Sequence, residues 1–120
     1  IGSGGKAVNQ SGNSTFQPDF VWIKNRDTYD SHMLFDALRG VTKSLNSNAI
    51  TTEATDTESL STFDADGFTV GSNVKVNTSS EDYVAWQWLA NGSGASNTEG
   101  SIHTTSTSAN TTAGFSMKVQ

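Results

Sequence analysis

The chain of 120 residues contains no cysteine, and Pro18 is its only proline. Without cysteine, disulfide bonds and thiolate zinc sites are excluded. The absence fits a protein that is made in a reducing cytoplasm, even one that later works outside the cell. Charged residues are also scarce, at 16% of the chain, so the disorder that strong charge produces is not expected.

Basic residues are outnumbered, with 7 Lys and Arg against 12 Asp and Glu, and the net charge is −5. Nucleic acid is therefore not an expected partner, because such binding needs a basic surface. The sequence also lacks a basic amphipathic face and any apolar run of transmembrane length. Membrane insertion is not expected either.

Apolar residues make up only 33% of the chain, and Ser, Thr, Asn and Gly take their place. Thr favours strands, whereas Ser, Asn and Gly favour turns. The length is that of one domain. We therefore expect residues 1–120 to form a single all-β domain with long polar loops and little helix. The strand pattern is unfinished at both ends, which predicts a fragment of a longer multi-domain chain.

The densest apolar run is Phe20–Ile23, which follows Pro18 and is apolar on both faces. This pattern predicts a strand that is buried on both sides, at the centre of a sandwich. Tyr83–Leu89 predicts a second central strand beside it. Two more main strands are expected at Phe68–Val70, after a tight turn at Asp66-Gly67, and at Phe115–Val119.

Several shorter elements complete the expected fold. Polar loops are predicted at Asn25–Asp30, Asn46–Ser59 and Asn91–Gly100, and a turn at Ile1–Gly5. The shorter predicted strands are Lys6–Val8, Ser31–Asp36, Val41–Leu45 and an edge strand at Ser101–Ser106.

No catalytic motif is present. His32 and His103 are the only histidines, and neither lies near a Gly-x-Ser-x-Gly nucleophile elbow. The sequence therefore predicts a protein that is not an enzyme.

Calcium is the one cofactor that the sequence suggests. Asp64-Ala65-Asp66-Gly67 resembles the start of a calcium loop, with Asp64 and Asp66 as ligands. An EF-hand would need Glu at its twelfth position, which is Lys75 here. A hairpin turn that uses Asp and Gly for backbone reasons is the simpler account, and both alternatives stay open.

The large aromatic residues also allow two interpretations. Trp22, Trp86, Trp88 and Tyr83 could present a platform for a sugar ring, but their apolar neighbours favour a place in the core. If one is exposed, Trp88 or Tyr83 is expected, because both lie near loops. Asn25 and Asn91 at the loop ends are the further candidate ligand contacts.

Several segments together resemble a known family. Phe16–Arg26 resembles the F-x-P-D-[LF]-V-W-I-K-N-R segment of a domain of unknown function in virion structural and tail proteins of marine bacteriophages, of the cyanophage and pelagiphage kind. This domain often stands beside SPRY-like or lectin-like modules. The segments that follow in the family's order are Ser31–Lys43, Phe63–Ser72, Tyr83–Trp88, Asn97–Ile102 and Ser108–Ser116.

The resemblance implies a virion protein, at the surface or in the tail, that is made in the host cytoplasm. The expected fold is an antiparallel β-sandwich of jelly-roll or concanavalin-like type. The expected function is particle assembly or host-surface attachment, in a tail fibre, a tail-associated protein or a capsid decoration. Other virion proteins, host-surface glycans and further copies of the chain are the expected partners. The alternative is a carbohydrate-binding, lectin-like module that could depend on calcium.

Overall fold

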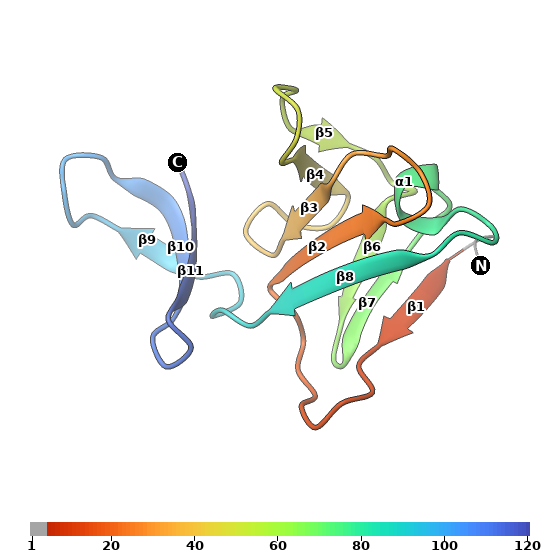
Figure 1. Cartoon of the computed structure of the whole chain (residues 1–120). Coiled ribbons are helices and arrows are strands. Elements are labelled where there is room, and N and C mark those ends of the chain that lie inside the picture. Colours follow the sequence, from red (N-terminus) through yellow and green to blue (C-terminus); the bar gives the residue numbers. More distant parts are fainter. Residues whose placement is uncertain (1–4) are drawn as a thin grey trace.

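The computed structural model describes residues 5–120, and nearly every regular element in this range is a strand (Figure 1). Of the turn predicted at residues 1–5, only Gly5 lies within the described residues. The one helix among residues 5–120, α1 (Val74–Asn77), was not predicted. The strands are β1 (Lys6–Asn9), β2 (Phe20–Asn25), β3 (Met33–Asp36), β4 (Lys43–Asn46), β5 (Ala54–Thr55), β6 (Leu60–Asp64), β7 (Gly67–Val70), β8 (Tyr83–Trp88), β9 (Ala95–Asn97), β10 (Thr104–Asn110) and β11 (Phe115–Val119).

The strands of the described part of the chain form three antiparallel sheets. A five-stranded sheet has the order β5-β4-β3-β2-β8, and a three-stranded sheet has the order β1-β7-β6. These two sheets pack on each other and confirm the predicted all-β sandwich. The third sheet, β11-β10-β9, stands to one side of the sandwich and is joined to it through the segment after β8 (Figure 1).

The hydrophobic core lies between the two sheets of the sandwich. The five-stranded sheet contributes Val21 and Ile23 from β2 and Met33 and Phe35 from β3. The opposite sheet and the helix complete the core with Leu60, Phe68, Val70 and Val76. These side chains are 0 to 5% exposed, so the apolar residues of both sheets leave water together.

β2 lies inside its sheet, between β3 and β8, as predicted. Only one of its faces is fully buried, because Val21, Ile23 and Asn25 point into the sandwich while Phe20, Trp22 and Lys24 are half-buried. The prediction of burial on both faces is therefore wrong. The apolar residues on the outer face belong to a surface cluster of aromatic side chains, not to the core.

Three other predictions need correction. β8 is not central, because it is the last strand of its sheet, beside β2. The strand predicted at Ser101–Ser106 begins later, as β10, and lies between β9 and β11 instead of at an edge. The hairpin turn consists of Ala65 and Asp66, and Gly67 already belongs to β7. Sequence shows where strands can form, but only long-range pairing decides which of them are edges.

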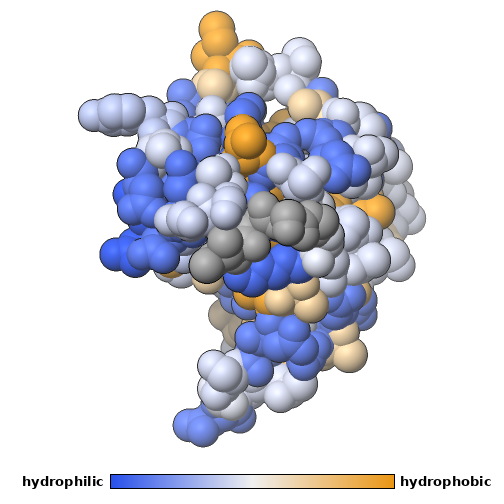
Figure 2. All heavy atoms as spheres, turned by 90° about the vertical axis from the view of Figure 1, so that its right-hand side faces the viewer, coloured by the Kyte–Doolittle hydropathy of each residue, from blue (hydrophilic) through white to orange (hydrophobic). Residues whose placement is uncertain are grey.

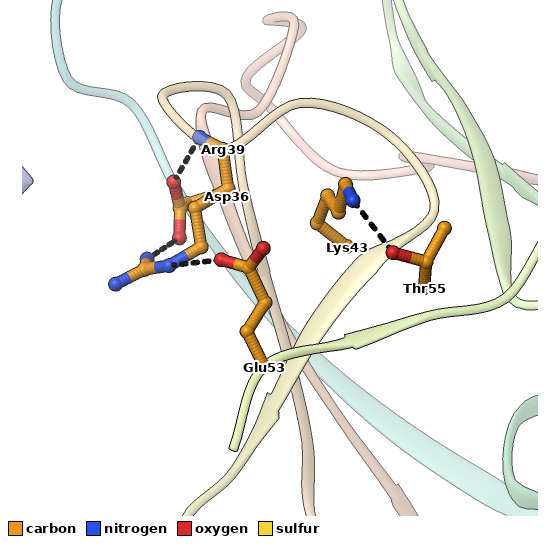
Figure 3. Close-up of polar contacts among 5 residues, drawn as sticks. All are labelled: Asp36, Arg39, Lys43, Glu53 and Thr55. Atoms are coloured by element: carbon orange, nitrogen blue, oxygen red, sulfur yellow. Dashed lines mark hydrogen bonds and ion pairs between the residues drawn. The ribbon is translucent and has the colours of Figure 1, made fainter.

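One side of the sandwich is closed by the segments that connect β3 to β6. Thr42 donates its backbone N–H to Leu60 O at 2.9 Å, and Asp56 donates to Thr42 O at 2.8 Å. Side chains hold the same region together (Figure 3). Arg39 pairs with Asp36 and, at 3.3 Å, with Glu53, and Lys43 donates to Thr55 Oγ1 at 2.6 Å.

The opposite side of the sandwich is open between β1 and β8. A cavity of about 530 Å³ lies there, and its apolar lining includes Val8, Phe68, Val76 and Ala85. Figure 2 shows the face that lies to the right in Figure 1, where hydrophobic residues form separate groups among hydrophilic ones. Among residues 5–120, no helix is long and apolar enough to cross a membrane.

Gly67 is required where β7 passes β1. Its φ is +156°, and a Cβ atom there would stand 2.0 Å from Val8 O. We expect Gly67→Ala to lower the free energy of unfolding by about 1–3 kcal/mol or more, because backbone has to move. Gly12→Ala is the matched control, since a Cβ at Gly12 meets nothing within 4 Å. Equal urea midpoints for the two variants would contradict this account.

Candidate functional site

The outer face of the five-stranded sheet carries a row of aromatic side chains, which we call the aromatic face: Phe20, Trp22, Trp86 and Trp88. The antiparallel register places Phe20 opposite Trp88 and Trp22 opposite Trp86. Residues directly opposite each other on antiparallel strands point to the same side of the sheet. Alternate residues of two paired strands therefore bring these four rings together.

Trp86 is the most exposed ring of the aromatic face, with 44% of its surface open to solvent. It packs against Trp22 with ring centroids 5.5 Å apart and an edge-to-face angle of 62°. Trp22 is fixed in turn, because its Nε1–H donates to His32 Nδ1 at 2.9 Å. The exposed indole thus rests on a second indole that cannot rotate without losing a hydrogen bond.

The other half of the aromatic face meets the third sheet. Phe115 of β11 lies 5.9 Å from both Phe20 and Trp88, measured between ring centroids. The rings of Trp88 and Phe115 are stacked, with 19° between their planes. This contact covers part of Trp88 and leaves Trp86 as the open end of the aromatic face.

Asp19 joins the third sheet to the sandwich. Its carboxylate is 5% exposed and accepts hydrogen bonds from the backbone N–H groups of Ala90 at 2.7 Å and Gly92 at 3.2 Å. Asn91 N–H, between them, donates to Ser108 Oγ of β10 at 2.7 Å. The segment after β8 is therefore held from both sides, which sets the position of Phe115 over the aromatic face.

The four predicted ligand contacts do not form one site. Trp88 is half-buried on the aromatic face, and Asn91 is exposed in the segment after β8. Asn25 is only 1% exposed and points inward, away from the aromatic face. The expectation that Trp88 or Tyr83 would be the exposed ring is also corrected, because Trp86 is more open than either.

Tyr83 has an internal role in the described structure. Its hydroxyl donates to Val74 O at 2.6 Å and accepts from Thr78 N–H at 2.8 Å, so it anchors both ends of α1. Asn25 Nδ2 reaches the same hydroxyl at 3.2 Å and the carboxylate of Glu81 at 2.5 Å. This network ties the loop after β2 to the loop before β8.

Asp64 and Asp66, the predicted calcium ligands, lie on either side of Ala65 in the β6–β7 hairpin. Asp64 accepts hydrogen bonds from Thr62 Oγ1 at 2.8 Å and Thr69 Oγ1 at 2.7 Å. Asp66 accepts one from Asn9 Nδ2 at 2.8 Å. Within residues 5–120, no group of three or more His, Asp or Glu side chains is placed to hold a metal ion. Calcium binding stays a prediction.

Two of the three predicted polar loops contain a short strand. Asn46–Ser59 contains β5, and Asn91–Gly100 contains β9. Tyr29, in the loop after β2, is fully exposed. His32 lies beside Trp22, whereas His103 is exposed between β9 and β10. The two histidines thus lie in different parts of the structure, His32 just before β3 and His103 just before β10.

The exposure of Trp86 is the feature that sequence reasoning missed. Period-two alternation places Val84, Trp86 and Trp88 on one face of their strand, and Phe20 and Trp22 on one face of another. The pairing of those two faces was the one sequence signal that could have indicated a cluster of aromatic rings. The missing information was that no further layer covers this face at Trp86.

Nearly the whole chain matches one protein family. Residues 1–119 match the family described as "Domain of unknown function (DUF7483)", and the chain belongs to this family. No curated protein and no solved structure matches the chain. The family membership confirms the resemblance at the level of a domain of unknown function.

Removal of the Asp19 carboxylate tests the joint between the sandwich and the third sheet. We expect Asp19→Ala to lower the free energy of unfolding by about 1–3 kcal/mol, because two N–H groups lose their charged acceptor. Amide hydrogen exchange should rise more in β9, β10 and β11 than in β2 and β3. Glu99→Ala removes an exposed carboxylate from the same region and is the control. Uniform exchange rates along the chain would rule out a local joint.

Proposed function

We propose that the chain is a surface module of a bacteriophage virion that mediates host-surface attachment or particle assembly. The observation that carries the proposal is the aromatic face, where Trp86 is 44% exposed on a rigid sheet. Large aromatic rings that are open to solvent and fixed in position are typical of binding surfaces. The resemblance of Phe16–Arg26 and the later segments to virion proteins supports the particle context.

The aromatic face suits adhesion because its side chains lose little conformational freedom on binding. Trp22 holds Trp86 from below, and its own Nε1–H is bonded to His32. A partner that covers Trp86 therefore gains apolar contact without first fixing a mobile side chain. The polar loops around the sandwich offer additional hydrogen-bonding groups.

The particle context is tested by antibody labelling. An antibody raised against the chain should decorate the surface or tail of particles purified from a phage that encodes it. Electron microscopy of gold-labelled particles is the measurement. Particles that contain no copy of the chain, by labelling and by mass spectrometry of the same preparation, would refute a virion role.

Substitution of Trp86 tests the aromatic face as the attachment site. We expect Trp86→Ala to weaken binding to marine bacterial cells, or to the purified virion proteins, by roughly tenfold or more. Tyr29→Ala is the matched control, because it removes an exposed aromatic ring from a loop outside the aromatic face. Loss of binding in Tyr29→Ala with Trp86→Ala unaffected would move the site to the loops.

A carbohydrate-binding, lectin-like function is the second candidate. The exposed indole of Trp86 favours it, because an aromatic ring offers a flat apolar surface to the face of a sugar ring. His32, bonded to Trp22 through its Nδ1, is a polar group next to these rings. This candidate differs from protein-mediated assembly in the chemistry of the partner.

A glycan array separates the two candidates and also tests calcium. If the module is lectin-like, the isolated chain should bind bacterial surface polysaccharides, and Trp86→Ala should abolish the signal. Loss of the signal in a chelator, restored by added calcium, would support the calcium-dependent form. Chelator-resistant binding would support an adhesin without a metal. A folded sample that binds no polysaccharide would leave protein–protein assembly as the function.

A further inference from the structure

The outer edge of β8 has unpaired backbone groups. Arg26 N–H donates to Asp82 O at 2.8 Å, in continuation of the β2–β8 register. Hydrogen-bonded pairs alternate along an antiparallel ladder, so Val84, Trp86 and Trp88 direct their backbone groups toward β2. The backbone groups of Tyr83, Ala85 and Gln87 therefore face outward. Among residues 5–120, no strand pairs with them.

The other sheet edges carry features that hinder pairing with another chain. β5 and β9 have only two and three residues, and β6 has an irregular register and gives Leu60 O to Thr42. β1 begins with Lys6, and β11 contains Lys118. Short length, irregularity and lysine are the usual protections of exposed edges.

β8 has none of these protections. Its six residues, YVAWQW, contain no charge, no proline and no glycine, and its register with β2 is unbroken. The chain as a whole carries a net charge of −5. A neutral, regular edge on an acidic protein is the place where two copies can approach with the least repulsion.

We propose that β8 is a dimerisation edge, at which a second copy of this chain pairs antiparallel to the first with Ala85 opposite Ala85. In this register, Tyr83 lies opposite Gln87 of the other copy, and all the outward backbone groups of the three residues find partners. The two five-stranded sheets become one continuous sheet across a two-fold axis. This inference does not depend on what the aromatic face binds.

The side chains agree with this register. Trp86 of one copy lies opposite Val84 of the other, an aromatic and β-branched pair that stabilises antiparallel sheets. Asp82 lies opposite Trp88, so the acidic residues that precede β8 are at opposite ends of the interface. Like charges therefore do not meet across the axis.

The pairing has two further consequences for the surface. It joins the two aromatic faces side by side, so that one dimer presents both copies of Trp86 in the same direction. It also places a strand at the open side of the sandwich, where the cavity of about 530 Å³ lies between β1 and β8. Gln10 Nε2 donates to Gln87 Oε1 there at 3.1 Å. This contact uses the Gln87 side chain only, so the backbone groups of Gln87 remain available for pairing.

The interface is small, because a six-residue edge and one half-exposed indole bury less than the roughly 800 Å² per partner of a typical stable complex. We therefore expect a reversible monomer–dimer equilibrium rather than a permanent dimer. Sedimentation velocity over a wide range of concentrations should show the wild-type chain shifting toward twice its mass. Ala85→Pro, which removes an outward N–H, should shift that equilibrium toward monomer.

A cysteine cross-link tests the register directly, because the chain has no cysteine of its own. In Ala85→Cys, the two copies of residue 85 would stand about 5.5 Å apart between Cα atoms, within disulfide range. We expect most of this variant to form a covalent dimer under a glutathione redox buffer. Ala7→Cys, on the edge strand β1 and more exposed than Ala85, measures random cross-linking.

A second pair of variants keeps the test independent of one substitution. Val84→Cys and Trp86→Cys should cross-link with each other when mixed, and Val84→Cys should cross-link poorly with itself. The proposal is overturned if Ala85→Cys cross-links no more than Ala7→Cys, or if the mixed pair shows no preference. It is also overturned if the wild-type chain stays monomeric at every concentration.

Discussion

The pairing of β2 on both sides is the constraint on which the rest of the structure depends. Hydrogen bonds to β3 and β8 fix the direction of every side chain along Phe20–Asn25. Successive residues of a strand point to opposite faces, so the same six residues build two different surfaces. Val21 and Ile23 enter the core, while Phe20 and Trp22 start the aromatic face.

The inner surface is buried and the outer surface is partly exposed to solvent, because only the inner one is fully covered. The β1-β7-β6 sheet and α1 close the inner face, and water is excluded from it. On the outer face, the third sheet reaches as far as Phe115, which packs on Phe20 and Trp88. The buried carboxylate of Asp19 sets this limit, since it holds the segment after β8. Trp86 lies beyond it and stays exposed.

The chain combines a β-sandwich with an exposed aromatic face and an edge strand, β8, that has no pairing partner among residues 5–120. The proposed roles use different parts of β8. In these proposals, the side chain of Trp86 serves attachment, and the outward backbone groups of Tyr83, Ala85 and Gln87 serve pairing with a second copy. Two weak contacts made together by a dimer bind more tightly than one, because the second contact forms at a high effective concentration. Such a gain would favour the attachment role that we propose.

The sequence by itself determined much of the local structure. The apolar runs predicted the positions of two strands, β2 from Phe20–Ile23 after Pro18 and β8 from Tyr83–Leu89. The turn at Asp66-Gly67 predicted the position of the β6–β7 hairpin. The sequence also indicated the all-β class through its Ser, Thr, Asn and Gly content. These features follow from propensity and from period-two alternation, which act over a few residues.

Tertiary structure alone decided which strand lies at an edge and which aromatic ring is open. Trp22, Trp86 and Trp88 look alike in sequence, because all three stand in apolar strands. Their exposure depends on layers contributed by distant residues, such as Phe115 over Trp88. The burial of Asn25 depends likewise on Glu81 and Tyr83, which are more than fifty residues away. Long-range packing of this kind leaves no periodic signal in the sequence, so only the folded chain shows it.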